Sequence, residues 1–310
     1  MKSKGLIFIK ANIAVFLAEL FNALNINAQK YLLPEWSSAT TMFFIRTLFA
    51  FILFSLIGLF TKPEKTELKD KLNMTLIGMI FLGGYILFYL FGVQDSSPID
   101  SSLIFTTMPV FVLVISILTH KEKGSKSKIA GLILALTGTI GLILIASPQE
   151  KHHSNSFIGN IFCLLSAFSY AMYLIYNKKY IAKYSTVTML KWMFLGATII
   201  SVPFMLIKGF DLKLITHISE NPYPFYTLIF VLLFPTGLTY FLLPYGLKYL
   251  NTTAVSMYDY EVPIVATIVA VTFTDNTLTG YQVVGALLIF IGVFLVSKEK
   301  KSTKSYENEL

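Results

Sequence analysis

The chain has 310 residues, of which 55% are hydrophobic and only 14% charged, and its mean hydropathy is +0.67. A soluble domain carries about a quarter charged residues and does not repeat apolar runs of about 20 residues, so this composition excludes a soluble globular protein. The formal net charge is +8, but the lysines fall between the apolar runs, which indicates membrane orientation and not nucleic-acid binding.

Ten apolar runs are long enough to cross the membrane, since about 20 helical residues span about 30 Å of hydrocarbon. In chain order they are 7–28, 37–60, 72–93, 100–119, 127–147, 157–177, 187–207, 224–246, 253–273 and 279–297. The connections between them are too short for a soluble domain. The polar segment 298–310 is predicted to be a disordered cytoplasmic tail. We therefore predict an all-α integral membrane protein with ten transmembrane helices.

The distribution of basic residues predicts the orientation of these helices. If the N-terminus is inside the cell, the cytoplasmic segments hold 19 lysines and the outer segments four, while Arg46 and Lys191 fall within helices. This bias follows the positive-inside rule and predicts that both termini are cytoplasmic. The short loops and the lack of a targeting segment indicate a bacterial plasma membrane.

The two halves of the chain match at a fixed spacing. Helices three to five align with helices eight to ten through pairs 154 residues apart, and the first helix aligns with the sixth at a spacing of 148. The pairs are Gly83/Gly237, Gly92/Gly246, Ser102/Ser256, Pro109/Pro263, Gly131/Gly285 and Gly138/Gly292. Five helices per half, an odd number, require opposite insertion of the halves. Such inverted repeats are typical of transporters whose substrate site lies between the halves.

We therefore expect a first five-helix repeat over 1–147 and a second over 157–297, arranged around a central cavity. The alternative is that the duplication reflects ancestry alone and does not imply transport.

Short motifs in the fourth, fifth, ninth and tenth helices carry a resemblance to a known family. They are the segment 106–111 (TTMPVF) with Glu122, Gly131 and Gly138, and the segment 261–266 (EVPIVA) with Gly285 and Gly292. In order and spacing, over about residues 7–297, they resemble the EamA-type exporters of the drug/metabolite transporter superfamily. The resemblance implies a ten-helix basket with a central cavity and the export of small metabolites, often amino acids.

Of the charged side chains inside the predicted spans, where a charge costs about 2.5–3.5 kcal/mol, four stand out. They are Glu19, Arg46, Asp259 and Glu261. At about 1.5 Å per residue, Glu19 lies roughly 18 Å and Glu261 roughly 12 Å along their helices, and Arg46 lies roughly 16 Å from the inner side. These three are expected near the midplane, whereas Asp259 is expected nearer the interface. Arg46 is the only arginine of the chain.

The first predicted helix carries a polar stripe. Asn12, Glu19 and Asn22 fall within about 80° of arc, and Gln29 extends the stripe. Polar groups at this depth must face protein or water. We predict that Glu19, Asn22 and Arg46 line the substrate site, with Glu19 and Arg46 forming a buried pair for which the substrate competes. The alternatives are asparagine hydrogen bonds between helices and a purely structural ion pair.

Glu261 is predicted to bind a proton or a substrate amine, since an apolar setting favours the neutral carboxyl group. Pro263 interrupts the backbone hydrogen bonds nearby and frees a carbonyl group. The alternative is an interhelical hydrogen bond at a proline kink. Aromatic side chains are predicted to form the walls of the same site, although packing and interfacial anchoring are the alternative roles. The tyrosines concerned are Tyr85, Tyr89, Tyr170, Tyr173, Tyr240 and Tyr258.

Together these features predict a secondary transporter that exports small metabolites, most simply amino acids or related zwitterions, by alternating access. Two alternatives remain open: a proton-coupled multidrug exporter centred on Glu19, and a flippase for lipid-linked sugars. An enzyme is not expected, because the chain has no paired-acid metal site, no GxSxG motif and no P-loop. No cofactor, metal or nucleic acid is expected; the expected partners are a small-molecule substrate, the lipid bilayer and protons, and a monomer is expected to suffice.

Overall fold

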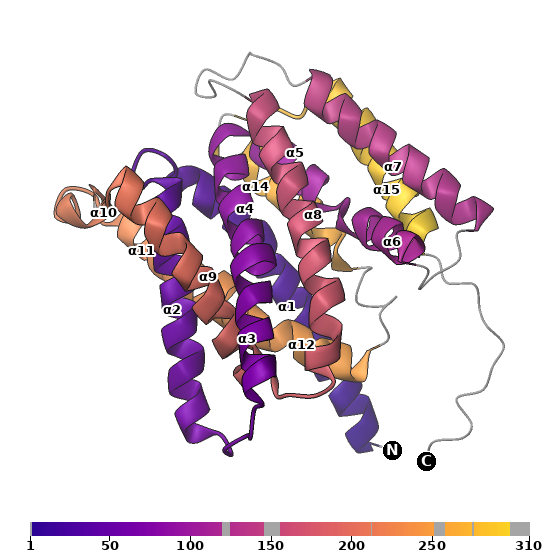
Figure 1. The fold of residues 1–310 in the computed structure, drawn as a ribbon. Helices are drawn as coiled ribbons and strands as arrows, with labels where there is room; N and C mark the ends of the chain where they lie inside the picture. Colours follow the sequence, from indigo (N-terminus) through magenta and orange to yellow (C-terminus); the bar gives the residue numbers. More distant parts are fainter. Residues whose placement is uncertain are drawn as a thin grey trace.

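The structure, a computed structural model, describes residues 2–119, 125–145, 156–211, 213–250, 258–274 and 276–297 (Figure 1). Within these ranges the chain is helical, with connecting turns and no strand. The elements are α1 (Lys2–Leu32), α2 (Ala39–Phe60), α3 (Leu68–Ile77), η1 (Gly78–Leu82), α4 (Gly83–Asp95), α5 (Pro98–Phe105), α6 (Met108–Leu118), α7 (Lys126–Ile145), α8 (Ser156–Ile181), α9 (Thr186–Lys208), α10 (Lys213–Thr216), α11 (Tyr223–Val231), η2 (Leu232–Leu238), α12 (Thr239–Tyr249), α14 (Glu261–Phe273) and α15 (Gly280–Ser297).

Eight helical segments of the described chain are long and apolar enough to cross a membrane. They coincide with the first eight predicted spans, although α1 extends past the predicted end at 28. The last two predictions, 253–273 and 279–297, contain shorter apolar helices, Glu261–Phe273 and Gly280–Val296. Residues 251–257, and the predicted tail at 298–310, lie outside the described residues. The chain is thus a multi-pass membrane protein, and a count of ten spans stays a prediction.

Serine side chains mark where several of these helices begin. The Ser38 Oγ accepts a hydrogen bond from the Thr41 amide at 3.2 Å and begins α2, and the Ser97 Oγ accepts from the Asp100 amide at 3.0 Å and begins α5. Such caps satisfy amide groups that have no partner within the helix, which matters most where no water is available.

Two long helices widen into π-helical turns at matching positions. The segment η1 begins at Gly78 and η2 begins at Leu232, 154 residues later. Turns also occur at corresponding positions: α5 and α6 are separated by a turn at Thr106 and Thr107, and a turn at Asp259 and Tyr260 precedes α14, 153 residues later. Broken and widened helices free backbone groups for other partners, so they are common where membrane proteins bind ligands.

Glycines bring α7 and α15 into close contact at one side of the bundle (Figure 1). A Cβ atom at Gly131 would lie 2.6 Å from the Gly292 carbonyl oxygen, and one at Gly138 would lie 2.9 Å from the Gly285 carbonyl oxygen. The contacts advance along α7 as they recede along α15, so the two helices are antiparallel. The four glycines are the ones that match at a spacing of 154.

A second pair of close glycine contacts relates the two halves by the same two spacings, 154 and 148 residues. Gly92 of α4 packs against Cys163 of α8, and Gly246 of α12 packs against Val15 of α1. Gly92 and Gly246 are 154 residues apart, and Val15 and Cys163 are 148 apart. Small residues let helix backbones approach closely in lipid, where packing and not hydrophobicity drives association.

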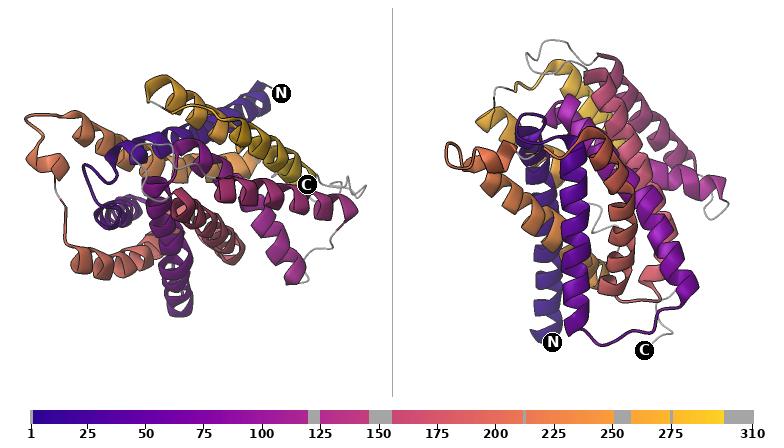
Figure 2. Two further views of the ribbon diagram at one scale, coloured as in Figure 1. Left: turned by 90° about the horizontal axis from the view of Figure 1, so that it is seen from above. Right: turned by 60° about the vertical axis from the view of Figure 1, so that its left-hand side comes forward.

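The main core lies between helices of both halves, and Figure 2 shows this bundle from two further directions. Phe54 of α2 and Phe194 of α9 stack with their ring centroids 5.8 Å apart and are fully buried. Because α1, α2, α4, α8 and α9 all contribute to this core, polar side chains on their inner faces are enclosed by protein.

We expect Gly131→Ala to lower thermal stability, because the added methyl group would meet backbone atoms of α15 that cannot move independently. Overpacking of this kind costs about 1–3 kcal/mol. Gly141→Ala is the matched control on the same helix, because nothing lies within 4 Å of its Cβ position. Thermal unfolding of both variants in detergent tests the contact; equal midpoints would contradict it.

Candidate functional site

The inner face of α1 carries a column of buried polar side chains. Glu19 is 5% exposed, and its Oε2 accepts a hydrogen bond from the Asn22 Nδ2 at 3.2 Å. One turn further on, the Asn25 Nδ2 donates to the Tyr89 hydroxyl at 2.7 Å, and Gln29 is fully buried. The predicted stripe therefore faces protein from Glu19 to Gln29, and it connects α1 to α4.

Arg46 is buried in the middle of the bundle, with 5% exposure. Its Nε donates to the Thr236 Oγ1 of η2 at 3.0 Å, and its guanidinium carbon lies 5.7 Å from the centroid of the Tyr89 ring. Its Nη1 is buried without a hydrogen-bond partner in the described structure. A buried guanidinium with unused donor capacity is costly, so this end of the interior is suited to receive an anion.

Glu19 and Arg46 do not form the ion pair that the sequence predicts. Among the described residues, the acid–base contacts within 4 Å include no partner for either side chain. The physical reason is that each group is held elsewhere: Glu19 by Asn22 on its own helix, and Arg46 by Thr236 and the Tyr89 ring. Two opposite charges therefore occupy one interior without neutralising each other by direct contact.

Tyrosines from α4 and α8 stack along this interior. The Tyr85 ring lies 4.7 Å from Tyr170 and 6.1 Å from Tyr89, and Tyr170 lies 5.6 Å from Tyr173, as centroid distances. The structure thus brings four of the six predicted tyrosines together. They offer flat apolar faces beside Arg46 and the polar column of α1.

Of the other two predicted tyrosines, Tyr240 borders this group and is close enough to Tyr85 and Tyr173 to interact with them electrostatically, whereas Tyr258 lies apart from it. Tyr240 packs against Phe194 and Phe54, with centroid distances of 5.1 and 6.5 Å, in the same core but on α12. Tyr258 belongs to a small separate cluster, where its hydroxyl donates to the Asn12 Oδ1 at 2.9 Å. The structure therefore gives Tyr258 no place beside the other tyrosines, because it precedes the turn that begins α14.

Glu261 begins α14, and α14 packs against α1. Two hydrogen bonds join the segments: Tyr258 to Asn12, and the Asn27 Nδ2 to the Ala266 carbonyl oxygen at 3.1 Å. Glu19 lies between the two contact points on α1, and Glu261 lies between them on the other segment. The two carboxyl groups are therefore at similar depth. The Glu261 Oε1 is buried without a partner in the described structure.

Sequence reasoning missed Thr236 and Asn25. Pro235 precedes Thr236 within a predicted span and marks a distorted helix, which was a usable signal for the site. Asn25 continues the spacing of Asn22 and Gln29 on one helical face, so periodicity could have included it. The described residues contain no group of three or more His, Cys, Asp or Glu side chains that could hold a metal ion.

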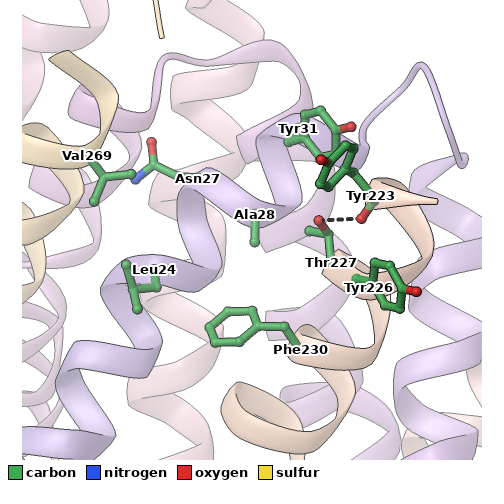
Figure 3. A pocket seen from close by; sticks show the side chains of 9 residues that line it. All are labelled: Leu24, Asn27, Ala28, Tyr31, Tyr223, Tyr226, Thr227, Phe230 and Val269. Carbon is green, nitrogen blue, oxygen red and sulfur yellow. Dashed lines mark hydrogen bonds between the residues drawn. The ribbon is translucent and has the colours of Figure 1, made fainter. Parts of the chain in front are cut away.

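A groove of about 430 Å³ lies elsewhere, between α1, α11 and α14 (Figure 3). Exposed tyrosines form its rim, and none of the ten predicted site residues lines it. Its lining consists of Leu24, Asn27, Ala28, Tyr31, Tyr223, Tyr226, Thr227, Phe230 and Val269. Because the lining carries no charged side chain, the groove does not have the chemistry of the buried interior, and the predicted central cavity stays a prediction.

An ionic clamp closes the end of the bundle at which α1 begins. The Lys183 Nζ lies 2.8 Å from the Glu67 Oε1 and 2.7 Å from the Asp70 Oδ2, and the Tyr184 hydroxyl donates to the same Asp70 oxygen at 2.6 Å. The Ser185 hydroxyl donates to Glu64 at 2.9 Å. Hydrogen bonds to Asp70 and Glu67 raise the pKa of Lys183, so it stays charged at neutral pH. The clamp joins the α2–α3 connection and the first turn of α3 to the α8–α9 connection.

The opposite end is closed by different contacts. The Asp211 amide donates to the Thr41 Oγ1 at 3.0 Å, and the Leu214 amide donates to the Trp36 carbonyl oxygen at 3.2 Å. These bonds join the segment between α9 and α11 to the α1–α2 connection and the first turn of α2. At the same end the Lys30 Nζ donates to the Gln94 and Ser96 carbonyl oxygens at 2.8 Å, so a charged side chain contributes there as well.

A multi-pass, helical membrane protein with buried charges that are held apart is typical of membrane transporters. The model of the EamA-like transporter family matches residues 9–144 and again residues 157–298. The chain therefore belongs to the EamA-like transporter family, which confirms the resemblance seen in its motifs.

The relatives are named as transporters. A protein of Archaeoglobus fulgidus, an uncharacterized transporter, is 24% identical over 72% of this chain and 76% of its own length, and one of Bacillus subtilis is 26% identical over 83% and 80%. A probable amino-acid metabolite efflux pump of Salmonella typhimurium is 26% identical over 73% and 78%. A solved crystal structure matches 95% of this chain and 96% of its own at 15% identity with a TM-score of 0.58, which shows a shared fold.

We expect Lys183→Ala to open the clamped end of the bundle, because one ammonium group holds two carboxylates of the neighbouring connection. Rapid labelling of a Tyr85→Cys reporter, in a background lacking Cys163, measures access to the interior. Lys191→Ala is the matched control, since Lys191 lies over the Trp192 ring and outside the clamp. The side chains of Lys183 and Glu67 are 47% and 68% exposed, so high salt should mimic the variant. Unchanged labelling in both conditions would contradict the clamp.

Proposed function

We propose that this chain is a secondary transporter that exports small metabolites, specifically amino acids or related zwitterions, by alternating access. The observation that carries the proposal is the presence of two buried, opposite charges that do not pair with each other, Glu19 and Arg46. A zwitterion carries a carboxylate and an ammonium group a short distance apart. One such molecule would pair with both Arg46 and Glu19.

In this proposal, different residues bind the two charged groups of the substrate. The free donor of Arg46 receives the carboxylate, for which a planar guanidinium is better suited than an ammonium group. Glu19 with Asn22, and Glu261 at similar depth, receive the ammonium group. The stacked rings of Tyr85, Tyr170 and Tyr173 cover the remainder of the substrate, and Tyr240 extends this wall.

We further propose that the halves over 1–147 and 157–297 are inverted repeats of five membrane-spanning helices, ten in all, around a central cavity. The matching π-helical turns, the matching helix breaks and the reciprocal glycine contacts of α7 and α15 support this arrangement. Two such halves allow a site between them to open alternately to each side, and one chain suffices. The lysine bias supports an orientation with both termini in the cytoplasm, and the short connections support a bacterial plasma membrane location.

A proton-coupled multidrug exporter is the second candidate, favoured by an acid on α1 beside aromatic rings. A cationic drug would leave the Arg46 donor unused and would add positive charge near it. This consideration favours a substrate with an anionic group.

Proteoliposomes loaded with a labelled amino-acid mixture test the proposal directly. We expect selective release, and we expect Arg46→Ala and Glu19→Gln each to slow it at least about tenfold, since a lost bond to a charged group is worth about 1.5–3 kcal/mol. Lys191→Ala and Glu35→Gln are the controls of like charge outside the site. If folded protein releases no amino acid but moves a lipophilic cation such as tetraphenylphosphonium, the second candidate replaces the first.

A pH gradient tests whether protons drive the cycle. We propose that Glu19 and Glu261 exchange the coupled proton, because both are acids at similar depth and Glu261 has an unpartnered oxygen. Release should therefore be faster with a gradient in the unsubstituted protein and in Glu35→Gln. The gradient should have no effect in Glu19→Gln or in Glu261→Gln. A variant that keeps its full response would show that its residue has no proton role.

A further inference from the structure

Thr236 stands at the point where the two halves of the chain meet around Arg46. It is 1% exposed, and its Oγ1 accepts the hydrogen bond from the Arg46 Nε at 3.0 Å. We propose that Thr236 is a positioning residue, which orients the Arg46 guanidinium so that the carboxylate of the substrate binds end-on. This inference rests on the proposed function, in which Arg46 binds that carboxylate.

The π-helical turn η2 explains why a threonine of the second half reaches an arginine of the first. Pro235 lacks an amide hydrogen and cannot continue the regular hydrogen bonds of an α-helix, so the helix widens over Leu232–Leu238. Gly237, the residue after Thr236, packs on α2, where its Cβ position lies 3.2 Å from Leu53 and 3.9 Å from Phe49. Close approach of η2 to α2 places the Thr236 hydroxyl within hydrogen-bond distance of Arg46.

The guanidinium is then held on two of its sides. Thr236 occupies Nε, and the Tyr89 ring lies 5.7 Å from the guanidinium carbon. Tyr89 is itself held by the hydrogen bond from the Asn25 Nδ2 at 2.7 Å. A carboxylate can bind an arginine either through Nε and one Nη, or through the two Nη atoms. Because Thr236 uses Nε, and Nη1 has no partner in the described structure, the end-on mode is the one available.

Thr239 provides a matched control one turn further along the same helix. It is also a buried threonine, at 6% exposure, but its hydroxyl has no hydrogen-bond partner in the described structure. Replacing either threonine by valine removes a hydroxyl group at nearly constant volume. A difference between the two variants therefore reports on the bond to Arg46 and not on polarity in this helix.

The test compares substrate affinity and maximal rate in proteoliposomes for Thr236→Val, Thr236→Ser and Thr239→Val. The probes are an amino acid that the unsubstituted protein releases and the amine that lacks its carboxyl group. For the amino acid, Thr236→Val should raise KM about tenfold with little change in maximal rate, whereas Thr236→Ser and Thr239→Val should stay within about twofold. For the amine, no variant should differ, because no carboxylate is present to be oriented.

Other outcomes separate the possible failures. If Thr236→Val impairs the amine as much as the amino acid, or if Thr236→Ser is equally impaired, the role is structural and the inference is wrong. If Thr236→Val leaves the KM of a transported amino acid unchanged, the inference is wrong and the proposed function stands. If the unsubstituted protein releases no amino acid, the proposed function is wrong and the inference falls with it.

Discussion

Arg46 is a buried charge, and side chains from several helices are needed to support it. A guanidinium that is 5% exposed within an apolar bundle must be supported by protein groups, because lipid offers none. The protein supplies the Thr236 hydroxyl from a widened turn and the Tyr89 ring from α4, and Asn25 of α1 holds that tyrosine in turn. Supporting one charge therefore connects α1, α2, α4 and η2, and the tyrosines of α8 border the same interior.

Close helix contacts and interrupted helices together surround this interior. The α7–α15 pair is joined through glycines that bring backbone against backbone, and it lies at one side of the bundle. The core around Phe54 and Phe194 is shared between the halves, and the helices around it contain π-helical turns and breaks. Bundles with tight pairs and interrupted helices can move as two units, because the interruptions absorb changes in backbone angle.

The two ends of the bundle are held by different contacts. Side chains of opposite charge centred on Lys183 hold one end, and hydrogen bonds donated by backbone amides and by Lys30 hold the other. The groove in Figure 3 lies between α1, α11 and α14 and is lined without charge. An uncharged lining suits hydrocarbon, whereas the buried acids and the arginine suit a substrate that carries charge.

The sequence by itself determined the membrane class, the positions of the apolar spans, the family, and which charges are costly enough to need partners. It could do so because hydropathy, residue spacing and the energetic cost of a buried charge are local properties, which can be read from the sequence directly. Only the tertiary structure decided how those charges are partnered. It separated Glu19 from Arg46, brought Thr236 against Arg46 and Asn25 against Tyr89, and placed Tyr258 against Asn12. Contacts between residues 190 apart, such as Arg46 and Thr236, depend on how a π-helical turn rotates side chains and on how closely two helices pack. Neither quantity is encoded in a local pattern of residues.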